Sequence, residues 1–240
     1  MGNILVMARR ELGAYFLSPI AYVVLAIFLF TTGLAFGLGT FQPGEEASLR
    51  SLCQSWMVLI LAIVLPILTM RLISEELRSG TIETLLTSPI SESQVVLGKF
   101  LGALVFYVVL LATILLYPIL LACFGPVDFK LLLCNLFGLF LMGALYIAVG
   151  LFFSACTKHQ IVAILCSVVV LAIFSFASHY LATKVEIAWV RILLQHLSIQ
   201  SHFHDFVRGL VDLNHVVFFV TTAVVFLFLA VKKLEMRRWQ

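Results

Sequence analysis

Four histidines are the residues of this sequence whose type and spacing point most directly to chemistry. His196, His202, His204 and His215 fall in the segment 180–215, and imidazole is a common metal ligand. Residues at positions i and i+2, such as His202 and His204, do not share a face of a helix. No carboxylate stands four residues from any of these histidines. We therefore expect polar residues at a water interface rather than a metal site.

Polar side chains inside the long apolar stretches could supply a nucleophile or an ion path, and they are Thr113, Asn135, Ser154, Ser167 and Ser175. No base accompanies them, as nucleophilic catalysis requires. No Asp, Glu, Lys or Arg falls inside the stretches, although ion-coupled carriers usually keep such groups there. We expect these polar side chains to form hydrogen bonds between helices.

The sequence also contains no nucleotide site of its own, because neither a GxxxxGK[ST] phosphate loop nor a dinucleotide fingerprint is present. If this chain moves something, its energy comes from elsewhere. An external energy source needs a surface on which to dock.

The polar segment 71–99 is our candidate for that surface. Gly80, after Ser79, is expected to interrupt a charged helix that extends the apolar stretch before it. Ile82, Leu85 and Leu86 then recur at i, i+3 and i+4, which places them on one face of a short helix. Pro89, preceded by Ser88, should end that helix. Such an apolar stripe is unfavourable in water, so it should lie in a groove of a partner protein. The alternative is a helix that lies on the lipid interface without a partner.

Helix is expected to restart directly after this segment. Ser91, with Gln94 three residues later, is a capping-box pattern that leads into the next apolar stretch. The short helix is therefore held between two longer ones.

Composition decides which elements position these residues. Apolar residues make up 62% of the 240 and charged residues only 11%, against about a quarter charged in a soluble domain. The charges are bunched, which fits hydrocarbon in the middle and water at each face. We predict an all-α membrane protein, with residues 1–240 as a single transmembrane domain. Its six predicted spans are 20–38, 56–70, 100–124, 131–153, 161–179 and 216–231.

Two further helical segments are expected outside the spans. Residues 1–18 have apolar residues at helical intervals and should form a helix along the membrane interface, ended by Ser18 and Pro19. The segment 180–215 is too apolar for a solvated loop. It should form helices that lie on, or dip into, the outer leaflet.

Six spans place both termini on one side, and basic residues indicate which side. With both termini inside, ten basic residues face the cytoplasm and five face outward. The inner set is Arg9, Arg10, Arg71, Arg78, Lys99, Lys158, Lys232, Lys233, Arg237 and Arg238. The outer set is Arg50, Lys130, Lys184, Arg191 and Arg208. We expect a multi-pass protein of a bacterial inner membrane with both termini in the cytoplasm.

The polar segment also carries a motif: Glu75-Glu76-x-x-x-Gly80-Thr81-Ile82-Glu83-x-Leu85-Leu86-x-x-Pro89-Ile90-Ser91. This motif resembles the cytoplasmic coupling motif of ABC-2 type transporter permeases. The chain is similar above all to the small six-span permeases associated with gliding motility, and to copper-processing and multidrug permeases. The resemblance extends over essentially the whole chain, including Lys158-His159-Gln160 and His202-Phe203-x-x-Phe206-x-Arg208-Gly209.

The resemblance implies an ABC-2 type permease fold and a half-transporter. A second permease copy or paralogue would pair with this chain, and two cytoplasmic ABC ATPase subunits would bind below. ATP and Mg would be held by the ATPase, so this chain would need no cofactor and would not be an enzyme. Residues 80–86 would be the coupling helix. The residues implied in coupling are Glu75, Glu76, Gly80, Thr81, Ile82, Glu83, Leu85, Leu86 and Pro89.

By the same analogy, Glu75, Glu76 and Glu83 would meet basic residues of the ATPase or organise the loop itself. Membrane lipid and an extracytoplasmic accessory protein are further partners to consider, and nucleic acid is not. An exporter is the function we expect. One alternative is an ATPase-driven scaffold or mechanical component of a surface or motility machine that moves no solute. Another is a membrane enzyme or ion-coupled carrier, against which the uncharged spans argue.

Overall fold

The structure is a computed structural model that describes residues 2–40, 56–81, 91–122, 128–184 and 187–238. Helices make up nearly all of these residues, and no strand occurs among them. This confirms the all-α class. The physical reason is that a long apolar segment in a membrane must satisfy its own backbone hydrogen bonds, and a helix does so locally.

Five helical segments are long and apolar enough to cross a membrane: Pro19–Leu38, Met57–Ser79, Glu92–Ala122, Phe129–Cys156 and Leu213–Arg237. They match the predicted spans one, two, three, four and six. The helices concerned are α2 (Pro19–Thr40), α3 (Met57–Thr69) with α4 (Arg71–Ser79), α6 (Glu92–Ile114) with α7 (Leu116–Ala122), α8 (Phe129–Cys156) and α13 (Leu213–Arg238).

The predicted fifth span, 161–179, is shorter than we expected. Its apolar helix covers Gln160–Phe176. α9 (Gln160–Ala172) passes directly into the π-helix η2 (Ile173–Ala177), and α10 (Ser178–Lys184) follows. A π-helical turn widens the helix and interrupts its regular hydrogen bonding, so the regular part of this segment ends before spanning length. By length and composition, the described chain thus has five spans and one shorter apolar helix.

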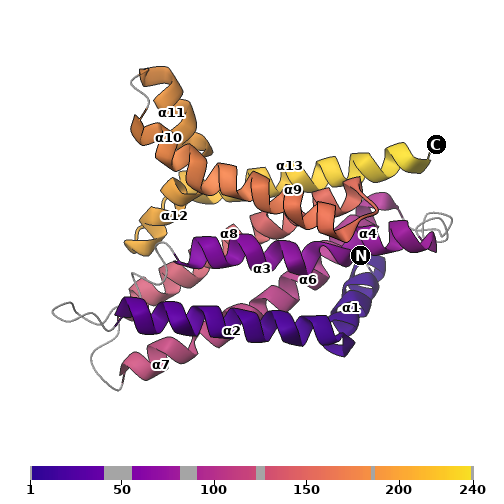
Figure 1. The fold of residues 1–240 in the computed structure, drawn as a ribbon, viewed down its shortest axis with the longest axis horizontal. Helices are drawn as coiled ribbons and strands as arrows, with labels where there is room; N and C mark the ends of the chain where they lie inside the picture. The colour runs from indigo at the N-terminus through magenta and orange to yellow at the C-terminus, as the bar shows by residue number, and fades with distance from the viewer. Residues whose placement is uncertain (1, 41–55, 82–90, 123–127, 185–186, 239–240) are drawn as a thin grey trace.

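α8 packs against α3, α6, α9 and α13, and α2 packs against α3 and α6. α8 contributes several fully buried side chains to the core, among them Met142 and Tyr146. α1 (Gly2–Leu17), which packs against α6, lies with α4 at one end of this bundle, and both chain ends lie toward that end (Figure 1). α7, α11 (Ala188–Leu197) and α12 (Ile199–Val207) lie at the opposite end (Figure 1).

The polar residues of the spans do not all bond between helices. Ser175 does, since its hydroxyl lies 2.8 Å from that of Tyr146, and so does Ser154. Thr113 and Ser167 instead donate to carbonyls of their own helices, because a helical Ser or Thr reaches the carbonyl one turn back. The side-chain oxygen of Asn135 is buried and has no hydrogen-bond partner among the described residues.

Candidate functional site

The segment predicted to dock a partner is entered through α4, which ends as its sequence predicts. Gly80 follows Ser79 with φ 75°, in the left-handed conformation that ends a helix and that glycine adopts at little cost. The Ser79 hydroxyl donates to the Glu75 carbonyl at 2.9 Å and lies 2.8 Å from the Thr81 hydroxyl. Thr81, the last described residue before the gap, is exposed.

α6 follows the segment, and the capping box predicted at its start is present. The Ser91 hydroxyl accepts the amide of Gln94, and the Gln94 side chain accepts the amide of Ser91, each at 3.4 Å. Residues 82–90 lie outside the described part of the chain. The structure therefore does not place five of the predicted coupling residues, namely Ile82, Glu83, Leu85, Leu86 and Pro89.

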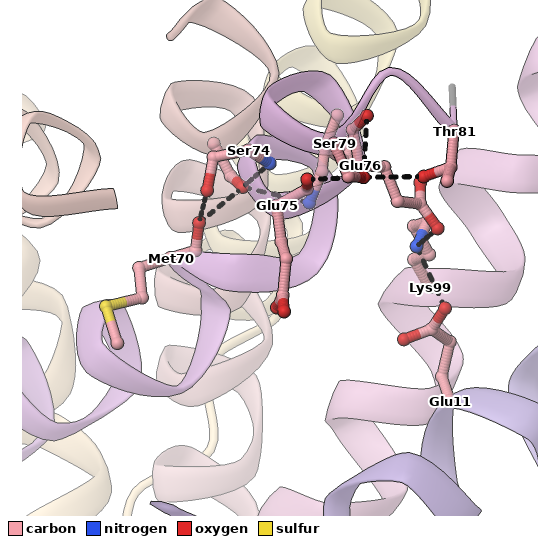
Figure 2. Close-up of polar contacts among 10 residues, drawn as sticks. Glu11, Met70, Ser74, Glu75, Glu76, Ser79, Thr81 and Lys99 are labelled. Carbon is pink, nitrogen blue, oxygen red and sulfur yellow. Dashed lines mark hydrogen bonds and ion pairs between the residues drawn. The ribbon is translucent and has the colours of Figure 1, made fainter. Parts of the chain in front are cut away.

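A buried lysine joins the two helices that flank this segment. The Lys99 ammonium on α6 lies 2.8 Å from Glu76 Oε1 on α4 and 2.8 Å from Glu11 Oε1 on α1, as Figure 2 shows. The Lys99 side chain is 1% exposed, and those of Glu11 and Glu76 are 14% and 17% exposed. We call this cluster the Lys99 bridge. One cation with two carboxylates leaves it a formal charge of −1, and Glu76 Oε2 is buried with no hydrogen-bond partner among the described residues.

Two glycines let α1 approach α6 closely enough for the bridge to form. A Cβ at Gly98 would lie 2.7 Å from Met7 Cβ, and one at Gly102 would lie 2.8 Å from Glu11 Cβ. Both distances are shorter than real side chains allow. The Gly98-x-x-x-Gly102 spacing is typical of close helix pairs in membranes, and here it flanks the turn that carries Lys99.

The boundary between α3 and α4 is held by a serine from α8. The Ser154 hydroxyl accepts the amides of Ile73 and Ser74, both at 3.0 Å, and donates to the Met70 carbonyl at 2.8 Å. The Ile73 amide is one of the four at the start of α4 that lack an acceptor within the helix, and the Ser74 amide is the next one along. Ser154 thus caps α4 from another helix and fixes α4 to the centre of the bundle.

An arginine makes a second link from α4 to the N-terminal region. Arg71 donates to the Ser18 hydroxyl at 2.6 Å, and its guanidinium lies 4.9 Å from the centre of the Tyr15 ring. The Tyr15 hydroxyl donates to the Leu68 carbonyl at 3.1 Å. Burial raises the pKa of Tyr15 well above its usual value, so this hydroxyl stays protonated as a donor. α2 begins at Pro19, as predicted. The turn between α1 and α2 is therefore linked to the start of α4.

The predicted glutamates have different surroundings. Glu76 is drawn into the Lys99 bridge, whereas the Glu75 side chain is exposed, points away from the bridge in Figure 2 and has no ion-pair partner among the described residues. Sequence reasoning treated Lys99 only as a basic residue facing the cytoplasm and did not select Glu11 as a functional residue. The available signal was a single lysine between Gly98 and Gly102 at the start of an apolar helix.

The arrangement consists of contacts that hold helices together. It has one lysine between two carboxylates, glycines at a close approach and a serine that caps a helix. Among the described residues, no group of three or more His, Cys, Asp or Glu side chains is arranged to hold a metal ion. What the site can do is keep α1, α4 and α6, the last two of which flank residues 82–90 in the sequence, in a fixed relation to one another.

Comparison with known families gives the same identification as the motif. A family model described as ABC-2 family transporter protein matches residues 41–234. It does not distinguish the gliding-motility branch that the sequence resembles, and none of the curated proteins matches the chain. The match covers most of the chain, including the coupling segment and all but the first of the spans. Together with the apolar helices of spanning length, it shows that this multi-pass membrane protein belongs to the ABC-2 family of transporter proteins.

Proposed function

We propose that this chain is the permease subunit of an ATP-driven exporter of a bacterial inner membrane. A separate ABC ATPase would bind at residues 74–91, and both chain ends would lie in the cytoplasm. The observation that carries the proposal is the Lys99 bridge, which ties the helix before the segment to the helix after it and to α1. A partner that moved residues 82–90 would therefore move three elements together.

The path of such a movement follows from the contacts of α4. Ser154 of α8 caps its start, and Arg71 links it to the turn before α2. ATP binding would close two ATPase subunits below a pair of permease chains and push on both coupling segments. The push would then reach α2, α6 and α8, which would rock and open a path between the two chains.

The chemistry of the spans bears on the cargo. Their charged groups gather at the helix ends and in the Lys99 bridge, while the cores of the spans are apolar. A path between such helices favours hydrophobic or amphipathic cargo, because a charged solute would lose its hydration without a compensating partner.

Co-purification with the ATPase tests the docking assignment. Glu83→Lys and Leu85→Asp should each reduce the amount of ATPase recovered with the full-length chain by about tenfold or more, since a buried apolar contact or charge pair contributes about 1.5 kcal/mol or more. Glu235→Lys makes the same charge change at a partly exposed position near the end of α13, where the carboxylate pairs with Lys232 of the same helix, and it should leave recovery unchanged. Unaltered co-purification of both coupling variants would contradict the assignment of this segment as the docking site.

Reconstituted vesicles test the transport assignment. We expect movement of amphipathic dyes only when the ATPase and ATP are both present. ATP turnover without any solute movement would favour the scaffold instead. Movement by this chain alone would favour a carrier.

A further inference from the structure

Two histidines face each other at the end of the molecule opposite the Lys99 bridge. His202 of α12 and His215 of α13 approach through their Nδ1 atoms, which are 2.6 Å apart. The other nitrogen of His202, Nε2, lies 3.0 Å from the carbonyl oxygen of His196. The other nitrogen of His215, Nε2, lies 2.7 Å from Oδ2 of Asp205. The groups form one hydrogen-bonded series, which runs from a carbonyl through two imidazoles to a carboxylate.

The number of protons in this hydrogen-bonded series can be counted from its two end groups. The His196 carbonyl only accepts hydrogen bonds, so His202 Nε2 must carry a proton. The Asp205 carboxylate only accepts, so His215 Nε2 must carry one too. The two Nδ1 atoms between them need one proton more, because one must donate and the other accept. Three protons on four ring nitrogens give the histidine pair a charge of +1, whichever ring holds the third.

We infer that His202 and His215 form a site that binds a single shared proton, and that this proton holds α12 against the start of α13. If the four ring nitrogens carry only two protons, both rings are neutral and one of the three hydrogen bonds is lost. With all four nitrogens protonated, two N–H groups point at each other across 2.6 Å. Only the singly charged pair can form all three hydrogen bonds.

The surroundings favour the pair with three protons over the pair with two and the pair with four. His202 is buried and stacks on the Phe218 ring, with centroids 4.1 Å apart. Burial lowers the pKa of His202, and the hydrogen bond to the His196 carbonyl opposes that effect. Burial therefore disfavours a charge on the His202 ring. The start of α13 disfavours a cation, and the Asp205 carboxylate at 2.7 Å offsets this.

Other ionisable groups lie on the elements packed around the pair. They are His196 on α11, His204 on α12, Arg208 at the end of α12, Asp212 before α13, and Asp128, Lys130 and Cys134 at the start of α8. Apart from the backbone carbonyl of His196, none of these groups contributes an atom to the three contacts that run from the His196 carbonyl to Asp205. The count of three protons therefore depends only on the four linked groups.

The pH dependence follows from comparing bound protons in the folded and unfolded states. Histidines in an unfolded chain have a pKa of about 6.5. Below about pH 6, the unfolded pair carries four ring protons and the folded pair three, so the lowered pKa of His202 makes the contact weaken as pH falls. Removal of the third proton as pH rises leaves both rings neutral and one of the three hydrogen bonds unmade, so the contact weakens in that direction too. The contact is strongest where the pair holds three protons.

Hydrogen exchange of the full chain in lipid nanodiscs tests the inference. After correction for the intrinsic pH dependence of exchange, the opening constant of peptides within 199–220 should be smallest at about pH 6.5. It should rise on each side by up to about tenfold per pH unit, the slope for one proton. His202→Gln and His215→Gln should each abolish this minimum. His196→Gln should keep it, because only the backbone carbonyl of that residue takes part.

Nitrogen-15 spectra of labelled histidine in the unaltered chain provide a test that does not depend on variants. At about pH 6.5 we expect three protonated ring nitrogens among the four of His202 and His215. Two or four would overturn the inference. A monotonic exchange profile in the unaltered chain, or a minimum that survives in both glutamine variants, would overturn it as well.

Discussion

Replacing Lys99 by methionine removes the cation of the Lys99 bridge while keeping most of the volume of the side chain. Lys99 is 1% exposed, and its ammonium is the only described ion-pair partner of both Glu11 and Glu76. The variant therefore leaves two carboxylates in one poorly solvated place without a counterion. The packing of Gly98 and Gly102 against α1 is unaltered by the change.

The magnitude follows from the burial of the three groups. Removing one partner of a buried ion pair costs about 3–5 kcal/mol, because a charge is left unpaired away from water. Glu11 and Glu76 keep 14% and 17% of their side-chain exposure, so we expect the lower end, about 3 kcal/mol. That corresponds to about a hundredfold increase in the equilibrium constant for separation of α1 from α6.

Hydrogen exchange of α1 in the full chain in nanodiscs measures this separation. Lys99→Met should accelerate exchange of the protected α1 amides by about a hundredfold. Lys158→Met makes the same replacement at an exposed lysine and should change the rate little. Adding Glu11→Gln and Glu76→Gln to Lys99→Met removes the unpaired charges and should recover much of the protection. Equal exchange in Lys99→Met and Lys158→Met would refute the assignment of the bridge as the link between these helices.

Two further predictions concern the same junction. Gly102→Leu should lower the melting temperature of the detergent-solubilised chain, because its Cβ alone would overlap a side chain of α1 at 2.8 Å, a strain of about 1–3 kcal/mol; an unchanged temperature would show that α1 is not packed there. Ser154→Ala should destabilise the first turn of α4 by about 2 kcal/mol, because the buried Ile73 amide loses its acceptor and the Ser74 amide loses one of its acceptors. Exchange at Ile73 and Ser74 reports this directly, and protection equal to that of the unaltered chain would contradict the capping role.

Local features of the fold could be predicted from the sequence. The break before Pro19, the left-handed Gly80 and the capping box at Ser91 each depend on a few adjacent residues. Five of the six spans were predictable because apolar length alone decides whether a helix can cross the membrane. The π-helical end of α9 was not, because its apolar composition continues unchanged through 173–177.

The sequence by itself therefore determined the class of protein, the positions of most spans and the two flanks of the coupling segment, because each follows from composition or from neighbours along the chain. Only the tertiary structure decided which charges meet. Lys99 is 88 positions from Glu11 and 23 from Glu76, and His202 is 13 from His215. Such contacts depend on how helices cross and how closely glycines let them approach. A basic residue that sequence alone placed at a water interface is for this reason a buried link between three helices.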